Sequence, residues 1–394
     1  MEKVFILAGA RTAIGSFGGS LATFRPADMG TMVMKEAIAR SGVGADKIQQ
    51  VAVGTVVATQ PKDAYVSRVA SINAGVPESS IAMNVNRLCG SGLQAIVSVT
   101  QAIKLGECDY AIGAGAESMS NAPHMTSAAR FGTRMGSIEL QDAMLGALHD
   151  PFEGIHMGVT AENVAMECQI SREDQDALAV ESHKRAAHAV ESGYFKEQIV
   201  PVEIKSRKGT KVFDTDEHFR ADATMESMAG LRPVFKKDGT VTAGNASGLN
   251  DGAAAVVIAS GKAVEAEGLT PMAEILSYGH GGVLPSVMGL GPVEAVPVAL
   301  ERAGLTLDQM DVIESNEAFA AQACGVAKSL GFDPARTNPN GSGISLGHPI
   351  GATGTILTIK CMYELQRTGG TYGLITMCIG GGQGIAMVIR NCAK

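Results

Sequence analysis

Cys89 stands in a glycine-rich turn whose residue types suit a nucleophilic thiol. Residues 86–92 read Asn-Arg-Leu-Cys-Gly-Ser-Gly, and the apolar spacing that follows predicts a helix over 93–105. The N-terminus of a helix presents free N–H groups and partial positive charge, which favour a thiolate. The glycines let a substrate approach the backbone closely. The alternative is a buried structural cysteine, which is the commoner fate of a lone cysteine.

His348 occupies a second glycine-rich turn, which resembles the first in its position before a helix. Residues 347–354 read Gly-His-Pro-Ile-Gly-Ala-Thr-Gly, and the pattern predicts a helix over 353–367. A histidine placed there can face Cys89 and accept the thiol proton, as cysteine nucleophiles require. The alternative is a histidine whose ring only satisfies carbonyl groups of the turn.

Cys378 and Asn316 each follow an apolar run that predicts a strand. Cys378 is followed by three glycines at 380–382, and such a turn can aim backbone N–H groups at an oxyanion. Asn316 precedes a helix predicted over 317–330, where it suits the N-cap. Its functional interpretation is a side chain that orients a water at an oxyanion. As a lone residue, Cys378 belongs in a core more often than in catalysis.

Short apolar runs alternate with longer helical patterns, which predicts an α/β fold. Buried strands are expected at 4–8, 51–57, 110–114, 253–259, 312–314 and 374–379. Helices are expected at 28–41, 93–105, 293–303, 317–330 and 353–367.

The sequence predicts an internal duplication, because each reactive turn leads into a helix and then a strand that ends in glycines. Between the two copies, residues 119–249 are more polar. That region contains one clear helix, capped by Ser171 with Asp174 three residues later and stopped by Gly193. We expect it to be an insertion that covers the substrate.

The overall charge and the cysteines restrict the partners and the compartment. The net charge of −8 gives no general attraction to nucleic acid or an anionic membrane. No apolar run is long enough for a transmembrane helix. Seven cysteines without CxxC spacing favour free thiols in a reducing compartment. The first residues enter a strand without a signal or transit pattern, so a cytoplasmic location is expected.

Four motifs in this order carry a resemblance to a known family. Asn-x-x-Cys-Gly-Ser-Gly at 86–92, Asn-Glu-Ala-Phe at 316–319, Gly-His-Pro-Ile-Gly at 347–351 and Cys-Ile-Gly-Gly-Gly at 378–382 together resemble the thiolases, specifically the acetyl-CoA acetyltransferase and β-ketothiolase branch. The resemblance covers essentially the whole chain, including segments 11–15, 115–120, 156–163 and 242–252.

The resemblance implies a thiolase fold, with duplicated halves layered α-β-α-β-α and an inserted loop domain. The expected divisions are 1–118 plus 250–270 for the N-terminal half, 119–249 for the loop domain and 271–394 for the C-terminal half. It also implies a homo-oligomer, a dimer of dimers, and acyl-CoA thioesters as substrates. No metal and no cofactor beyond these thioesters are expected.

The resemblance further implies a role for each residue that matches a family motif. Cys89 carries the acyl group, His348 activates it, Cys378 moves the proton at the α-carbon, and Asn316 holds a water that stabilises an enolate. The backbone N–H groups of Cys89 and Gly380 bind an oxyanion. Positions near the pantetheine and acyl end of coenzyme A are matched by His156, Met157, Phe235, Ser247, Gly248, Met288 and Phe319. Positions near its nucleotide end are matched by Arg220 and Ser227. Further contacts with coenzyme A are implied for Ala243 and Ala318. The reaction implied is the reversible Claisen condensation of two acyl-CoA molecules to a 3-oxoacyl-CoA and free coenzyme A. The acyl-chain range implied is short, with a broad β-ketothiolase range as the alternative.

Two other functions and one further binding region fit parts of the sequence. A 3-oxoacyl-carrier-protein synthase shares the halves but would carry a second histidine or an asparagine in place of Cys378. A catalytically idle coenzyme A- or lipid-binding protein is the other alternative, because fold does not fix function. The basic residues Lys205, Arg207, Lys208 and Lys211, with Arg220, suit the phosphates of coenzyme A or simply form a solvated loop. Ser315 and the run 340–344 depart from the usual family pattern and leave the acyl-chain preference open.

Overall fold

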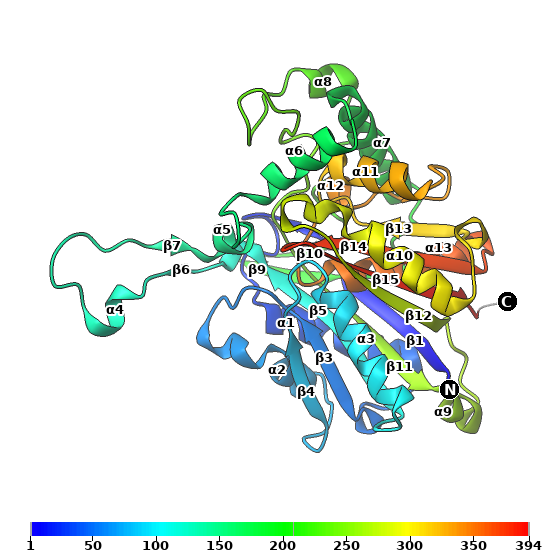
Figure 1. The fold of residues 1–394 in the computed structure, drawn as a ribbon. Coiled ribbons are helices and arrows are strands. Elements are labelled where there is room, and N and C mark those ends of the chain that lie inside the picture. The colour runs from blue at the N-terminus through cyan, green and yellow to red at the C-terminus, as the bar shows by residue number, and fades with distance from the viewer. Residues whose placement is uncertain (1, 208, 393–394) are drawn as a thin grey trace.

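The computed structural model describes residues 2–207 and 209–392, and its elements stack in layers of helices and strands (Figure 1). The strands are β1 (Val4–Thr12), β2 (Gly15–Ser16), β3 (Gln50–Gly54), β4 (Ile81–Val85), β5 (Tyr110–Ser118), β6 (His124–Met125), β7 (Gln141–Asp142), β8 (Ile199–Val200), β9 (Val202–Ser206), β10 (Gly209–Phe213), β11 (Asn250–Ser260), β12 (Ala273–Gly282), β13 (Val312–Ser315), β14 (Tyr372–Ile379) and β15 (Gln383–Asn391). The helices are α1 (Pro26–Ser41), α2 (Val66–Asn73), α3 (Ser91–Lys104), α4 (Ala128–Phe131), α5 (Ala143–Ala147), α6 (Met157–Glu167), α7 (Arg172–Glu191), α8 (Met225–Ala229), α9 (Gly261–Glu267), α10 (Gly291–Ala303), α11 (Ala320–Leu330), α12 (Gly343–Leu346) and α13 (Thr353–Thr368).

The expected duplication is confirmed by the strand pairing. In the N-terminal half, β1 and β11 pair antiparallel, as do β11 and β5, whereas β5, β3 and β4 run parallel. In the C-terminal half, β12, β15 and β14 pair antiparallel, and β13 joins β14 in parallel. A parallel bridge between Ile313 and Thr337 stands where β4 stands in the first half. The two halves therefore share one topology.

The two halves meet along one edge and enclose a central layer of helices. Strands β1 and β12 pair antiparallel through Phe5 with Glu274 and Ile6 with Ala273, so the strands form one continuous sheet. Helices α3 and α13 contact each other and strands of both halves. Helix α1 packs on β1, β5 and β11, and α10 packs on β12, β14 and β15. This gives the layered α-β-α-β-α arrangement that the resemblance implies.

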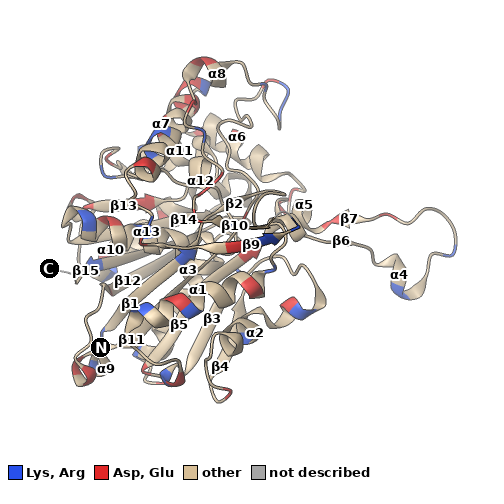
Figure 2. Cartoon of the chain, turned by 180° about the vertical axis from the view of Figure 1, so that it is seen from behind, with Lys and Arg blue, Asp and Glu red and all other residues tan. Residues whose placement is uncertain are grey.

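Charge is distributed as this layering requires. The strands of the sheet carry few charged residues, and lysine, arginine, aspartate and glutamate gather on the outer helices and loops (Figure 2). Burial explains the difference, because an unpaired charge is costly away from water. Two buried ion pairs join Arg11 to Asp216 and Lys360 to Glu314, and the buried Glu117 and Asp251 are hydrogen-bonded to N–H and hydroxyl groups. Among the helices of the described residues, none combines the length and the apolar character that crossing a membrane requires.

Several predicted elements end at different residues in the structure. The predicted strand 51–57 stops at Gly54, because the N–H groups of Val56 and Val57 bind the Glu117 carboxylate instead of a neighbouring strand. The predicted helix 317–330 begins at Ala320, so Phe319 is its N-cap and Asn316 is not. Helix α7 has the predicted Ser171 cap, and Asp174 completes the capping box. Strands β4, β12 and β15 and helices α2 and α6 were not predicted.

Candidate active site

Most of the side chains that the sequence placed near an acyl group line one cavity of about 260 Å³. The cavity brings Cys89 of the N-terminal half together with His348 of the C-terminal half. Predicted residues in its wall are His156, Met157, Phe235, Ser247, Gly248, Met288, Ala318 and Phe319. The sequence did not predict Met119, Leu145, Leu148, Ala246, Leu249 and Ile350, which complete the lining. The cavity suits an apolar chain beside a thiol and an imidazole.

The Cys89 turn is held by its own side chains. The Ser91 hydroxyl donates to the Leu88 carbonyl (2.6 Å) and accepts from the Arg87 N–H (2.8 Å). The Asn86 side-chain oxygen accepts from the Leu88 N–H (3.1 Å). Leu88 adopts φ 47°, a left-handed conformation that is uncommon for a residue other than glycine. The turn thereby presents Cys89 just before α3, which begins at Ser91.

The thiol of Cys89 is protonated in the resting site, contrary to what its place near a helix N-terminus predicts. Burial is the largest effect and raises the pKa of Cys89 to about 11, and the nearby Glu117 adds to the increase. Backbone hydrogen bonds from the N–H groups of Gly380 and Cys89 act in the opposite direction. Because desolvation outweighs these donors, the thiol needs a base before it can attack.

His348 is buried and has the properties of that base. Thr353 donates its hydroxyl proton to the Pro349 carbonyl (2.9 Å), so the Thr353 oxygen accepts from Nδ1 of His348 (2.7 Å). This network assigns the proton to Nδ1 and leaves the lone pair on Nε2. Burial lowers the pKa of His348 to about 4, so the imidazole is neutral near pH 7. The Asn316 amide nitrogen lies 3.4 Å from Nε2.

Cys378 and Asn316 lie behind the cavity wall, each close to one of the groups above. Cys378 is fully buried at the end of β14. Burial raises its pKa well above the usual range, and the neighbouring Cys89 adds to the effect. Asn316 is also fully buried, and within the described part of the chain its Oδ1 atom has no hydrogen-bond partner. The structure thus brings both predicted residues to the Cys89–His348 pair.

A second cavity of about 210 Å³ contains the residues predicted for the nucleotide end of coenzyme A. Arg220, Ser227 and Ala243 line it together with His183 and His218, which the sequence analysis missed. The only sequence signal for His218 is its position two residues before Arg220. Ala246 lines both cavities. The two cavities therefore adjoin at this residue and can hold the two ends of one long ligand.

The basic stretch near residue 205 does not belong to either cavity. Lys205 and Lys211 lie on the β9–β10 hairpin, with Arg207 in its turn, and Lys208 lies outside the described residues. Of the predicted basic set, Arg220 lines the second cavity. Within the described residues, no group of three or more His, Cys, Asp or Glu side chains could hold a metal ion.

Comparison with known proteins agrees with this geometry along the whole chain. The family profile "Thiolase, N-terminal domain" matches residues 4–262, and "Thiolase, C-terminal domain" matches residues 269–391. The chain is 61% identical to beta-ketothiolase BktB of Cupriavidus necator over 391 residues, which is 99% of each protein. It is 48% identical to an acetyl-CoA acetyltransferase of Syntrophomonas wolfei, covering 99% of this chain and 100% of the relative.

A solved structure shows the same fold. The crystal structure of human mitochondrial 3-ketoacyl-CoA thiolase in complex with CoA superposes with a TM-score of 0.96 at 43% identity, covering 99% of this chain and 98% of that one. The carrier-protein synthase interpretation and the idle binding protein both lose support, because the profiles, the relatives and the intact cysteine–histidine pair agree. The chain belongs to the thiolase family and is an acyltransferase.

Proposed function

We propose that this thiolase condenses two short-chain acyl-CoA thioesters to a 3-oxoacyl-CoA, and cleaves the product in reverse, through an acyl group carried on Cys89. The observation that carries the proposal is the meeting of a protonated thiol and a neutral imidazole in one apolar cavity. A thiol of raised pKa is nucleophilic only after a base takes its proton. His348 supplies the lone pair.

The first half-reaction transfers an acyl group to the enzyme. Nε2 of His348 takes the thiol proton, and the sulfur of Cys89 attacks the thioester carbonyl carbon. The carbon–sulfur bond to coenzyme A then breaks, and Cys378 gives its proton to the departing sulfur. The N–H groups of Gly380 and Cys89 converge on the Cys89 sulfur, which supports their proposed role as donors to the oxyanion.

The second half-reaction forms the carbon–carbon bond. The Cys378 thiolate removes a proton from the α-carbon of a second acetyl-CoA, and the enolate carbon attacks the acyl carbonyl on Cys89. The bond to Cys89 breaks, and its sulfur regains the proton held by His348. The raised pKa of Cys378 supports this role, because a strong base suits a weak carbon acid. His348 and an Asn316-held water are proposed to stabilise the enolate oxygen.

Coenzyme A is proposed to occupy both cavities. The apolar cavity takes the acyl group and the pantetheine, and the cavity of Arg220, His183 and His218 takes the nucleotide end. Cationic and N–H donors suit phosphate oxygens. The modest size of the first cavity supports a preference for short acyl chains. The reaction needs no group besides the thioesters. A reducing compartment, the cytoplasm, is proposed from the seven free cysteines.

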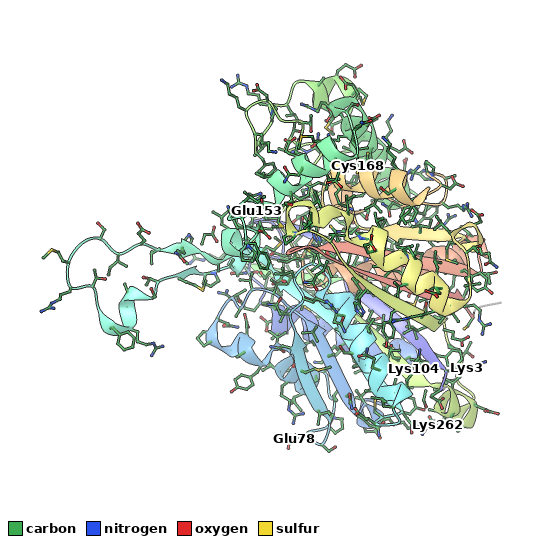
Figure 3. The ribbon with its side chains drawn as sticks, in the orientation of Figure 1. Lys3, Glu78, Lys104, Glu153, Cys168 and Lys262 are labelled. Atoms are coloured by element: carbon green, nitrogen blue, oxygen red, sulfur yellow. The ribbon has the colours of Figure 1, made fainter. Side chains whose placement is uncertain are left out.

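A dimer of dimers is proposed as the assembly. The segment of β6, α4 and β7 stands clear of the body, with its side chains extending away from it (Figure 3). Phe131 is 92% exposed and Met135 is 93% exposed on this segment. Large exposed apolar side chains mark interaction surfaces. Light scattering should give a tetramer at micromolar concentration, and a monomer would contradict the assembly.

Rapid mixing with acetyl-CoA, followed by mass spectrometry of peptides, tests the proposed function. We expect an acetyl group on Cys89 of the wild type and no adduct in Cys89→Ala, which should fold normally because the change removes one sulfur atom from the wall of a cavity. Cys108→Ala is the matched control, since Cys108 is a free, buried cysteine outside the cavity. An adduct that persists in Cys89→Ala would show that another residue carries the acyl group.

A further inference from the structure

The turn that carries His348 contacts the N-terminal half through backbone more than through side chains. The carbonyl oxygen of Gly351 faces Gly54, Gly92 and Gly115, and a Cβ atom at any of these positions would lie 2.5–3.0 Å from it. Those three glycines come from the end of β3, the start of α3 and the middle of β5. Only residues without a side chain permit so close an approach. The N-terminal half thus forms a glycine-lined socket for the turn.

Two polar side chains of the N-terminal half bind the N–H groups at the two ends of this turn. Oδ1 of Asn250 accepts from the His348 N–H (2.9 Å). Oε2 of Glu117 accepts from the Gly351 N–H (2.8 Å). Both side chains are fully buried. Residues 348 and 351 bracket the turn, so the two bonds fix its position and its rotation relative to the N-terminal half.

Glu117 reaches the turn because of its place on β5. Gly113 and Gly115 face α3 and the start of α13, and alternation along the strand puts Glu117 on the same face. Its carboxylate also accepts from the N–H groups of Val56 (3.0 Å) and Val57 (3.1 Å). Three backbone donors from two loops therefore converge on one carboxylate. Burial raises the pKa of Glu117 to about 8, and the three backbone N–H groups act in the opposite direction.

Asn250 is anchored on its other side as well. Its amide nitrogen donates to the Gly15 carbonyl (3.0 Å), and a Cβ atom at Gly347 would lie 2.5 Å from its side chain. Segments 11–15, 115–120 and 242–252 were all part of the family resemblance without a role for Gly15, Glu117 or Asn250. These contacts connect all three segments to the His348 turn.

We propose that Glu117 and Asn250 are positioning residues that hold His348 in register with Cys89, so that the half carrying the nucleophile also places the base. The inference rests on the proposed roles of Cys89 and His348. Among the described residues that line the two cavities, neither Glu117 nor Asn250 occurs. Their loss should therefore change the rate of acylation and leave substrate binding nearly intact.

The test compares Glu117→Met with Asp251→Leu. Each change removes a fully buried carboxyl group near the same edge of the sheet and leaves its donors unpartnered, but the donors to Asp251 come from residues 118–120 and not from the His348 turn. Displacing a reacting group by about 1 Å can cost about 100-fold in rate. We expect Glu117→Met to slow acetylation of Cys89 about 10- to 100-fold, with KM for acetyl-CoA within about twofold of wild type. Asp251→Leu should stay within about threefold in rate.

Asn250→Ala is the second variant and covers the case in which Glu117→Met does not fold. It should also slow acetylation of Cys89 and leave KM for acetyl-CoA nearly unchanged. Thermal melting reports whether each variant is folded. Folded variants that acetylate as fast as Asp251→Leu would overturn the inference. An acetyl group found on a residue other than Cys89 in the wild type would instead overturn the proposed function.

Discussion

The two reactive turns occupy equivalent places in the duplicated halves but are held in different ways. The Cys89 turn is built from local bonds of Asn86 and Ser91, with Leu88 in a left-handed conformation. The His348 turn is held from outside by Glu117 and Asn250, within three glycines of the other half. The nucleophile is thus placed by its own segment, and the base by its partner half. Substitutions near the Cys89 turn and substitutions near the His348 turn should therefore impair the enzyme in different ways.

The largest difference is expected between His348→Ala and Cys378→Ala. His348→Ala should slow acetylation of Cys89 about 10²- to 10⁴-fold, as removal of a general base does. Cys378→Ala should still be acetylated, because the nucleophile and His348 remain and the coenzyme A thiolate can leave unassisted. It should neither exchange the methyl protons of acetyl-CoA for deuterium nor condense two acetyl units. Rapid quench and NMR exchange measure the two steps.

Wild-type deuterium exchange in Cys378→Ala would contradict the assignment of the carbon base. His348 would then be the first alternative, since its unprotonated Nε2 faces the same site. Equal loss of both steps in the two variants would contradict the separate roles proposed for His348 and Cys378.

Thr353→Val should have the next largest effect, because it acts on the His348 turn alone. The change removes the acceptor of the Nδ1 proton, so the imidazole loses its fixed tautomer. We expect acetylation to fall about tenfold, equivalent to about 1.4 kcal/mol of lost hydrogen bonding. Thr358→Val is the matched control, since Thr358 is buried on α13 and donates to the carbonyl four residues earlier in the same way. A control as slow as Thr353→Val would refute the tautomer argument.

Stability should fall in acid because His348 is buried in its neutral form. Its pKa is about 4 in the folded protein and about 6.5 when unfolded, so the unfolded chain binds more protons between these values. The contribution of His348 to the free energy of unfolding is fully present above pH 6.5. It is lost as the pH falls from 6.5 toward 4, and the total loss is about 3 kcal/mol. Denaturant titrations at fixed protein concentration measure it. His348→Gln should flatten the slope, and an unchanged slope would contradict the burial argument.

The smallest effect is expected for Ser91→Ala, which weakens the local support of the Cys89 turn. The variant leaves the Arg87 N–H without its partner, while the Leu88 carbonyl still accepts from the Ser91 N–H; the cost is about 1–3 kcal/mol in the free energy of unfolding. The acetylation rate should fall only a few-fold, because Asn86 and the left-handed Leu88 still shape the turn. Ser98→Ala, on the same helix, serves as the control. A loss larger than that of Thr353→Val would reverse the comparison.

The sequence predicted the layered fold, and its predicted elements were wrong where groups far along the chain bind the backbone. Ser171 and Asp174 lie three residues apart, so their capping box is visible locally and was predicted. Val56 and Val57 continue an apolar run, and only Glu117, some 60 residues later, ends the strand by taking their N–H groups. Helix α11 starts late for a similar reason: the Ala320 N–H binds the Asn245 carbonyl (2.8 Å).

The protonation state of the Cys89 thiol could not be predicted from the sequence either. The helix N-terminus was visible, but the burial that raises the pKa depends on residues from both halves. His183 and His218 were missed because neither belongs to a recognisable spacing, and the fold alone brings them to Arg220.

The two strands at which the halves meet, β1 and β12, carry the same irregularity. In β1 the register with β11 slips after the third residue, leaving Leu7 without an opposing residue, and in β12 the register with β15 slips after the third residue at Leu276. Such bulges are inherited features of a strand and not defects. The equivalent bulge in β1 and β12 is therefore a second respect, besides the strand pairing, in which the two halves are copies of one unit. A site built between two such copies receives one turn from each, and here one turn supplies a thiol and the other an imidazole.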